Sequence, residues 1–352
     1  MRWIRYVRTV GSDFDDLWGE LAKDPVLVIL GGGFDPRVPR AVSRIIEVAS
    51  AQVDVLRVDL GAETSDPPMQ QIAANNRVQV DEMVSSAGGA VIEQPFPEVH
   101  ARRSIGLSVS REFHQSGLLE RYRQIAVDVS GLPRSVYFPL LRGLLTVGES
   151  WGGDVHVIAC ESHLVDSALI EEGAEEPAPL GGFAGPDGDG QWAATVWVPV
   201  LGEGMSDQLA ALLDAINPDE VVPVLPFPSI NPRRGDDLVL EHRELLFDGL
   251  EVEPRNYLYA SDSNPFDIYR AVSDLYDRYQ ASLHPLGAAR FVLSTHSSKL
   301  LSVGVLLAAL EKGIRVMHVS PSRYGLRAGT DPDDLADAGM LTDLWLAGAP
   351  YK

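Results

Sequence analysis

The sequence has a single cysteine, Cys160, among its 352 residues. An internal disulfide needs two cysteines and a thiolate zinc site needs several, so both are excluded. None of the 8 histidines falls into an HxxxH or HExxH pattern, and no metal site is predicted. Cys160 precedes His163 closely, but nearness in sequence does not give a nucleophile and its base the required geometry.

Long apolar runs are also missing. No stretch approaches the roughly 20 consecutive apolar residues that a transmembrane helix needs. The opening segment, MRWIRYVRTVGSDFDDLW, has no apolar core followed by a small-residue cleavage site of the kind found in signal peptides. The sequence therefore predicts a cytoplasmic protein with no membrane partner.

Basic residues are scarce: 29 Lys and Arg stand against 50 Asp and Glu, which gives a net charge of -21. Such a chain repels nucleic acid and anionic membranes on average, so direct binding to a nucleic-acid duplex is not expected. Any polyanionic ligand would have to meet a local basic site. Apolar residues make up 45% of the chain, which is enough for one or two cores.

Short apolar, β-branched runs alternate with helical patterns along the whole chain, a rhythm typical of βαβ units and a mostly parallel sheet. Residues 171–191 are rich in Glu, Pro, Gly and Asp and are predicted to form a linker or loop. We therefore expect an α/β protein made of two Rossmann-like modules, with mostly parallel sheets flanked by helices. The modules are predicted at residues 1–170 and 192–352. Strands are predicted at residues 26–30, 53–60, 90–92, 125–129, 155–159, 195–201, 221–225, 256–260, 290–294 and 314–319, with the strand at 90–92 a short one.

The two predicted modules have similar outlines. Residues 26–40 look like residues 221–236, and residues 125–145 look like residues 290–310. In each case an apolar strand runs into a small polar loop that carries a base and then into an apolar helix. The similarity favours two pseudo-equivalent modules.

In an open parallel sheet, ligands bind beyond the carboxyl ends of the strands, where the strand order reverses. The first predicted loop of this kind holds Gly31, Gly32, Gly33, Asp35 and Arg37. Glycines let a ligand approach bare backbone N–H groups, and the helix that follows favours negative charge at its start. The alternative is a tight turn that needs glycine only for packing.

A second loop contains Asp128, Ser130 and Arg134. Asp128 lies near the end of an apolar strand, so its carboxylate needs a partner, for which Arg134 or a backbone N–H is suitable. An aspartate at this position is also suited to bind a ribose hydroxyl or a metal. A structural Asp–Arg pair that shapes the turn remains equally open.

Two further loops carry bases in the predicted C-terminal module. Arg233 and Arg234 follow a proline-rich turn and suit a phosphate, although the aspartates beside them also allow a self-neutralising surface network. Ser297, Ser298 and Lys299 precede an apolar helix and form a natural cradle for an anion. Their structural alternative is an N-cap serine followed by an exposed lysine.

The motif Gly31-Gly32-Gly33-Phe34-Asp35-Pro36 resembles the GGxFDP opening of the nicotinate-nucleotide adenylyltransferase family. In that family an HxGH motif follows and binds the phosphates of ATP. Here the matching stretch is RVPRAV, which has no histidine. Adenylyl transfer is therefore not expected to carry over.

The duplicated layout, and above all RFVLSTHSSKLLSVGVLLAAL at residues 290–310, resembles the CARF and SAVED group of Rossmannoid ligand sensors from prokaryotic defence systems. The resemblance implies paired modules that bind cyclic oligonucleotides, with a separate effector domain. The Gly-Gly-Thr that usually precedes the lysine in that group is His-Ser-Ser here, and no effector is recognisable in the sequence.

The first functional hypothesis is a binding or sensor protein for a phosphorylated or nucleotide-type small molecule, with a possible role in antiviral defence. It expects Arg37, Arg134 and Lys299 to converge on one cavity. The second is an enzyme, a hydrolase or nucleotidyltransferase, with Asp35 or Asp128 as general base or metal ligand. The third is a structural subunit of a complex with itself or a partner protein. The sequence identifies no cofactor.

Overall fold

The computed structural model describes residues 1–59, 66–93, 102–186, 192–331, 335 and 339–352. The chain divides into two compact units. The first unit comprises residues 5–172 and 323–352, and the second comprises residues 1–4 and 173–322. The boundaries of the two units therefore differ from those predicted at both ends of the chain. Residues 323–352 belong to the first unit, and residues 1–4 belong to the second.

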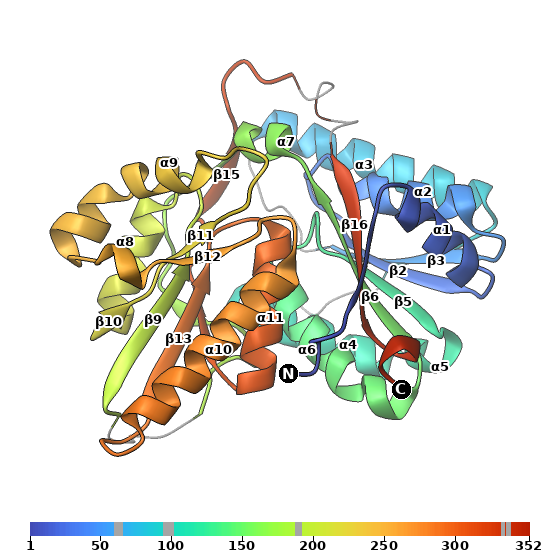
Figure 1. The fold of residues 1–352 in the computed structure, drawn as a ribbon. Coiled ribbons are helices and arrows are strands. Elements are labelled where there is room, and N and C mark those ends of the chain that lie inside the picture. The colour runs from blue at the N-terminus through green and yellow to red at the C-terminus, as the bar shows by residue number, and fades with distance from the viewer. Residues whose placement is uncertain (60–65, 94–101, 187–191, 332–334, 336–338) are drawn as a thin grey trace. The chain divides into compact units, whose positions relative to one another are not determined.

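The first unit is built around a mixed sheet with the strand order β1-β16-β6-β5-β2-β3-β4. Strands β2 to β6 are mutually parallel, and β16 is antiparallel to both of its neighbours. Figure 1 shows this sheet with α1, α2 and α3 over one face and α4 and α6 over the other. The elements are β1 (Val7–Val10), α1 (Ser12–Leu21), β2 (Val26–Gly31), α2 (Val38–Val48), β3 (Val53–Val58), α3 (Pro67–Ser86), β4 (Val91–Glu93), α4 (Arg102–Gln115), α5 (Leu118–Arg121), β5 (Gln124–Asp128), α6 (Arg134–Trp151), β6 (Asp154–Glu161), α7 (His163–Ala168), β7 (Leu169–Glu172), β15 (Arg323–Leu326) and β16 (Met340–Ala347).

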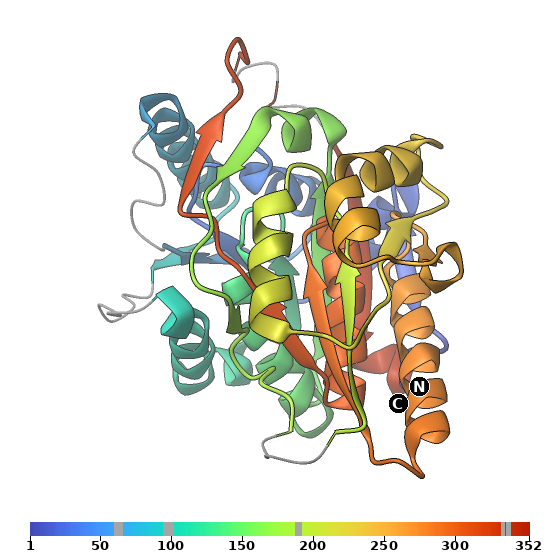
Figure 2. The same ribbon diagram turned by 90° about the vertical axis from the view of Figure 1, so that its left-hand side faces the viewer.

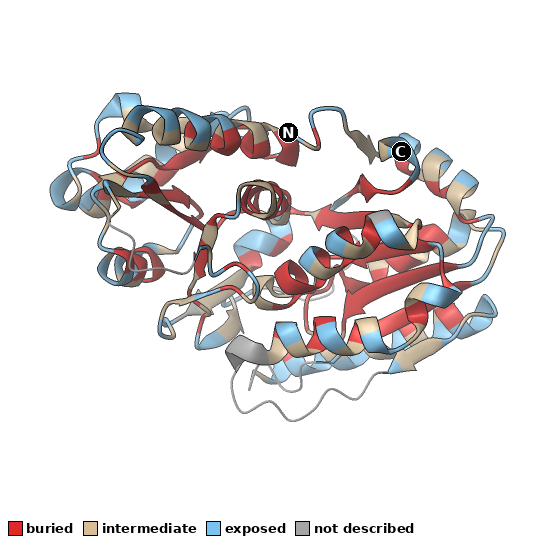
Figure 3. Cartoon of the chain, turned by 90° about the horizontal axis from the view of Figure 1, so that it is seen from below, coloured by how far each residue is buried: buried red, intermediate tan, exposed pale blue. Residues whose placement is uncertain are grey.

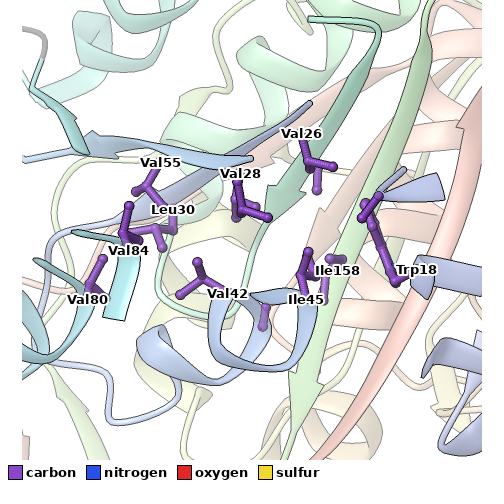
Figure 4. Close-up of a cluster of buried hydrophobic side chains, with 14 of the residues drawn as sticks. Trp18, Val26, Val28, Leu30, Val42, Ile45, Val55, Val80, Val84 and Ile158 are labelled. Carbon is purple, nitrogen blue, oxygen red and sulfur yellow. The ribbon is translucent and has the colours of Figure 1, made fainter. Parts of the chain in front are cut away.

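Strand β2 shows why this sheet is buried on both faces. Its residues are apolar without alternation, as expected of a central parallel strand. Val28 and Leu30 pack with α2 and α3 in one core cluster, and Figure 4 shows them beside Val42. Leu27 and Ile29 alternate with them and are equally buried, so helices cover both faces of the strand.

The C-terminal strand β16 lies between β1 and β6 in the sheet. The sequence pattern predicted no strand in this part of the chain. The Asp343 side chain of β16 accepts a hydrogen bond from Nδ1 of His156 on β6, with N–O distances of 3.0 and 3.1 Å to the two carboxylate oxygens. Both side chains are completely buried. This pairing explains why residues 340–347 belong to the first unit and not to the predicted C-terminal module.

The second unit has the strand order β12-β11-β9-β13-β14-β8, and β10 also pairs with β9. All of these pairings are parallel except that of β8 with β14. Helices α8 and α9 lie on one face of the sheet, and α10 and α11 lie on the other (Figures 1 and 2). The elements are β8 (Ala178–Pro179), β9 (Ala194–Val200), α8 (Ser206–Ile216), β10 (Glu220–Val221), β11 (Val224–Pro226), α9 (Arg234–Glu241), a π-helical turn (Glu244–Gly249), β12 (Leu258–Ala260), α10 (Pro265–Leu283), β13 (Ala289–Thr295), α11 (Lys299–Lys312) and β14 (Arg315–His318).

Burial follows this layering (Figure 3): the central strands of each sheet are buried and the outer faces of the helices are exposed. Helix α11 is buried from Leu300 to Ala309, which accounts for its unbroken apolar sequence. The two-module α/β fold predicted from the sequence is therefore confirmed, with mostly parallel sheets flanked by helices.

The predicted linker at residues 171–191 contains packed structure. Residues 178–179 form β8, which pairs with β14, and Leu180 and Phe183 are buried in the second unit. Residues 187–191 lie outside the described part of the chain. Although the segment is acidic and rich in glycine, the burial of Leu180 and Phe183 is enough to hold part of it against the sheet of the second unit.

The two units share one topology. Numbered in chain order, β4-β3-β2-β5-β6 and β12-β11-β9-β13-β14 both follow the Rossmann-like order 3-2-1-4-5. The predicted equivalence of residues 125–145 with 290–310 matches β5 and β13, each the fourth strand. The predicted equivalence of residues 26–40 with 221–236 is wrong, because β2 is a first strand and β11 is a second strand. The counterpart of β2 is β9.

Candidate functional site

The strand order of each unit reverses between its first and fourth strands, so the loops after these strands meet at one edge. In the first unit these are the loops after β2 and β5. A Cβ atom added to Gly31 would lie 2.4 Å from the carbonyl oxygen of Gly131, so the two loops are in backbone contact. We call this region the first carboxyl edge and its equivalent in the other unit the second carboxyl edge.

Arg37 is the central cation of the first carboxyl edge, and carboxylates surround it. Its guanidinium donates to Asp35 through Nε at 2.9 Å and Nη2 at 2.8 Å, and to Asp166 through Nη1 at 2.7 Å. Only 3% of the residue is exposed. Burial alone would lower the pKa of Arg37, but the charges of Asp35 and Asp166 raise it above its ordinary value. The predicted phosphate donor is thus engaged in holding the turn after β2.

Asp128 is 1% exposed at the end of β5. Its Oδ1 accepts a hydrogen bond of 2.9 Å from the backbone N–H of Ser130, whereas Oδ2 has no hydrogen-bond partner in the described part of the chain. Burial raises the pKa of Asp128 to about 6; the charge of Asp35 adds to this rise and that of Arg37 opposes it. Of the two partners that the sequence allowed for Asp128, the structure therefore shows the backbone N–H, and Arg134 is the half-buried first residue of α6.

Ser130 also forms hydrogen bonds that stabilise this part of the fold. Its Oγ accepts the backbone N–H of Cys160 at 2.8 Å, which ties the loop after β5 to strand β6. The Cys160 thiol is buried, and burial raises its pKa to about 12, with a further rise caused by the charge of Asp128. A thiol that stays protonated at neutral pH is a poor nucleophile, and His163 is exposed at the start of α7.

The second carboxyl edge contains the loop between β13 and α11. His296 and Ser297 are buried there, and the Oγ of Ser298 caps α11 by accepting the N–H of Leu301 at 3.3 Å. Lys299 is the half-buried first residue of the helix. The structure thus gives Ser298 the cap role that was the structural alternative, while Ser297 and Lys299 stand beside the cap.

The adjacent Arg233 and Arg234 have different environments. Arg233 is exposed. Arg234 is buried and donates to Glu203 at 2.7 and 3.1 Å and to Asp262 at 3.4 Å. It therefore joins three loops, those after β9, β11 and β12.

Glu203 is a residue that the sequence reasoning missed. It follows the predicted strand at residues 195–201, so the rule about strand carboxyl ends would have selected its loop. That loop also contacts the loop after β13, because a Cβ on Gly202 would lie 1.9 Å from the carbonyl oxygen of His296. The second carboxyl edge is therefore one continuous arrangement of four loops.

The predicted site residues fall into two groups, one in each unit. The first carboxyl edge contains Gly31, Gly32, Gly33, Asp35, Arg37, Asp128, Ser130 and Arg134, and the second contains Arg233, Arg234, Ser297, Ser298 and Lys299. The two buried arginines, Arg37 and Arg234, are both bound to carboxylates.

Among the described residues, no group of three or more His, Cys, Asp or Glu side chains is placed to hold a metal ion. The helices of the described ranges also include none with the length and apolar character needed to cross a membrane.

No protein-family model matches the chain, and no curated protein matches it. Among solved structures, the cytoplasmic domain of a prokaryotic cation chloride cotransporter aligns over 85% of this chain and 96% of its own, with 9% identity and a TM-score of 0.27. A putative universal stress protein from Pseudomonas aeruginosa UCBPP-PA14 aligns over 87% and 95%, with 12% identity and a TM-score of 0.23. UDP-GlcNAc 2-epimerase from Neisseria meningitidis bound to UDP-GlcNAc aligns over 78% and 77%, with 7% identity and a TM-score of 0.22. At these TM-scores the similarities give no guide to a ligand or a reaction.

Proposed function

We propose that the chain is a cytoplasmic binding protein for a phosphorylated or nucleotide-type small molecule, held at the second carboxyl edge. The observation that carries the proposal is the position of Ser297 and Lys299 at the start of α11, where the strand order reverses between β9 and β13. A helix N-terminus favours an anion, and a hydroxyl and an ammonium group beside it supply further donors. Arg234 supports the site by joining the neighbouring loops.

A sensing role is the finer form of this proposal. Residues 290–310, which resemble the CARF and SAVED sensors, correspond to most of β13, the loop after it, and α11 from Lys299 to Leu310. On that resemblance we propose that the ligand is a cyclic oligonucleotide and that binding favours one conformation of the chain, or of a partner protein, over another. The prokaryotic defence role rests on the same resemblance.

The test is a thermal-shift screen with mononucleotides, dinucleotides and cyclic oligonucleotides. A ligand that binds the folded state raises the melting temperature. Lys299→Ala should then weaken the binding of the stabilising ligand by about 10- to 100-fold, the loss expected for a charge-assisted bond to phosphate worth about 1–3 kcal/mol. Lys23→Ala is the matched control, because Lys23 is exposed in the first unit and pairs with Glu20. No shift with any ligand, or unchanged affinity in Lys299→Ala, would contradict the proposal.

One observation favours a second function, an enzyme that acts on a phosphorylated or nucleotide-type molecule bound at the first carboxyl edge. The Oδ2 of Asp128, which accepts no hydrogen bond from any described residue, and a pKa of about 6 suit a general base. Asp35 does not share this character, because Arg37 binds both of its oxygens. Turnover of the stabilising ligand that is lost in Asp128→Asn and kept in Asp274→Asn, an exposed control, would select the enzyme. If no ligand binds at all, the structural-subunit hypothesis remains.

A further inference from the structure

A pocket of about 560 Å³ lies in the second unit, at the edge of the sheet where its strands begin. Trp192 precedes β9, Arg290 lies at the start of β13, and Arg315 is the first residue of β14. Because β13 extends from Ala289 to Thr295, the pocket is about 20 Å from the second carboxyl edge. Its volume falls within the range of about 300–1,000 Å³ typical of small-molecule sites.

Two arginines, Arg290 and Arg315, line this pocket. None of the described residues that line it is an aspartate or glutamate. Arg315 donates its Nε to the carbonyl of Ala184 at 2.5 Å, and no described side chain forms an ion pair with Arg290 or Arg315. Burial lowers the pKa of Arg290, and the charge of Arg315 lowers it further. These two guanidinium groups therefore differ from Arg37 and Arg234, because among the described residues no carboxylate pairs with them to relieve their mutual repulsion.

Aromatic side chains form the other part of the wall. Tyr276 and Phe291 pack with ring centroids 5.1 Å apart at an angle of 66°, and Trp192 also lines the pocket. Gln280 fixes the wall by exchanging two hydrogen bonds, of 2.7 and 3.2 Å, with the backbone of Ala289. Aromatic faces pack against flat rings, and the planar guanidinium fork matches the oxygens of a phosphate.

We propose that this pocket binds a small organic phosphate that carries a flat ring, with Arg290 and Arg315 on the phosphate and the aromatic side chains against the ring. The bound anion would relieve the repulsion between the two arginines, and the aromatic wall would supply apolar contact. The site is separate from the second carboxyl edge and does not depend on the function proposed there.

The test is isothermal titration of the full chain with adenosine monophosphate, adenosine and inorganic phosphate. We expect adenosine monophosphate to bind more tightly than either part alone. Arg290→Gln should weaken its binding at least tenfold, and Arg278→Gln, an exposed arginine on α10, should leave it unchanged. Absence of binding to the wild-type chain, or equal binding to both variants, would overturn the proposal.

Two further measurements keep the outcome clear. Loss of adenosine monophosphate binding in Lys299→Ala, with binding kept in Arg290→Gln, would place the nucleotide at the second carboxyl edge and overturn the pocket proposal. The second measurement is modification of the wild-type chain by phenylglyoxal, followed by peptide mass spectrometry. Because it uses the wild-type chain, its result does not depend on the folding of a variant. Adenosine monophosphate should protect Arg290 and Arg315 but not Arg278. Equal modification with and without the nucleotide would also overturn the proposal.

Discussion

Gly202 packs so closely against His296 that a Cβ on residue 202 would lie 1.9 Å from the His296 carbonyl oxygen. Gly31 has the same relationship with Gly131 in the other unit, at 2.4 Å. In both units the contact joins the loop after the first strand to the loop after the fourth. Neither Gly31 nor Gly202 is among the residues with positive φ, so lack of space, not backbone conformation, requires glycine here.

We therefore expect Gly202→Ala and Gly31→Ala to destabilise their units by about 1–3 kcal/mol, the usual cost of forcing extra atoms into a packed region. Gly235→Ala is the control, because the nearest atom to a Cβ at that position is 3.7 Å away. Urea unfolding measures the difference. Equal stability of Gly202→Ala and Gly235→Ala would show that the backbone contact is easily relaxed.

Asp128 should make stability depend on pH. Its pKa is raised from an ordinary value of 3.8 to about 6 in the folded protein, so the folded state binds its proton more tightly than the unfolded state does. The contribution of Asp128 to stability is therefore fully present below about pH 4, falls as the pH rises through about 6, and amounts to about 3 kcal/mol.

This prediction is tested by unfolding the wild-type chain and Asp128→Asn at a series of pH values. The difference in unfolding free energy between the two should change between about pH 4 and pH 6 and be constant above this range. Asp274→Asn, which changes an exposed carboxylate, should show no such change. A wild-type curve parallel to that of Asp128→Asn would contradict the raised pKa.

The neighbouring arginines Arg233 and Arg234 should respond very differently to replacement. Arg234→Ala leaves Asp262 buried without its cation and should cost about 1–3 kcal/mol. Arg233→Ala changes an exposed side chain and should alter stability by less than about 0.5 kcal/mol. Thermal unfolding of the two variants gives a matched comparison, and similar losses would show that Arg234 does not hold the loops together.

The carboxylate of Asp343 should contribute to the free energy of unfolding of the first unit. Asp343→Ala leaves the buried His156 without its partner, between the rings of Trp18 and Trp345 at 5.0 and 4.8 Å. We expect a loss of about 1–3 kcal/mol, the cost typical of leaving a buried hydrogen-bonding group without its partner. Asp16→Ala, on the exposed side of α1, is the control. A loss below about 1 kcal/mol in chemical unfolding would show that His156 finds another partner.

The fold class and most strands could be predicted from local sequence. Runs such as residues 26–30 and 290–294 are apolar without a break because they are covered on both faces, and that property is visible in the residues themselves. The loops that end these strands were also found, since glycines, hydroxyls and bases mark them. A local sequence pattern is enough to predict an element wherever burial or a turn restricts which residue types can occupy its positions.

Only the tertiary structure decided which partners these residues meet. Residues 340–347 pair with β6, and Arg37 and Arg234 meet carboxylates from distant loops, which turns expected ligand donors into supports of the fold. The pocket at Arg290 and Arg315 likewise joins residues from separate strands. Strand order and the pairing of charges depend on contacts between residues far apart in the chain, and no local pattern encodes them.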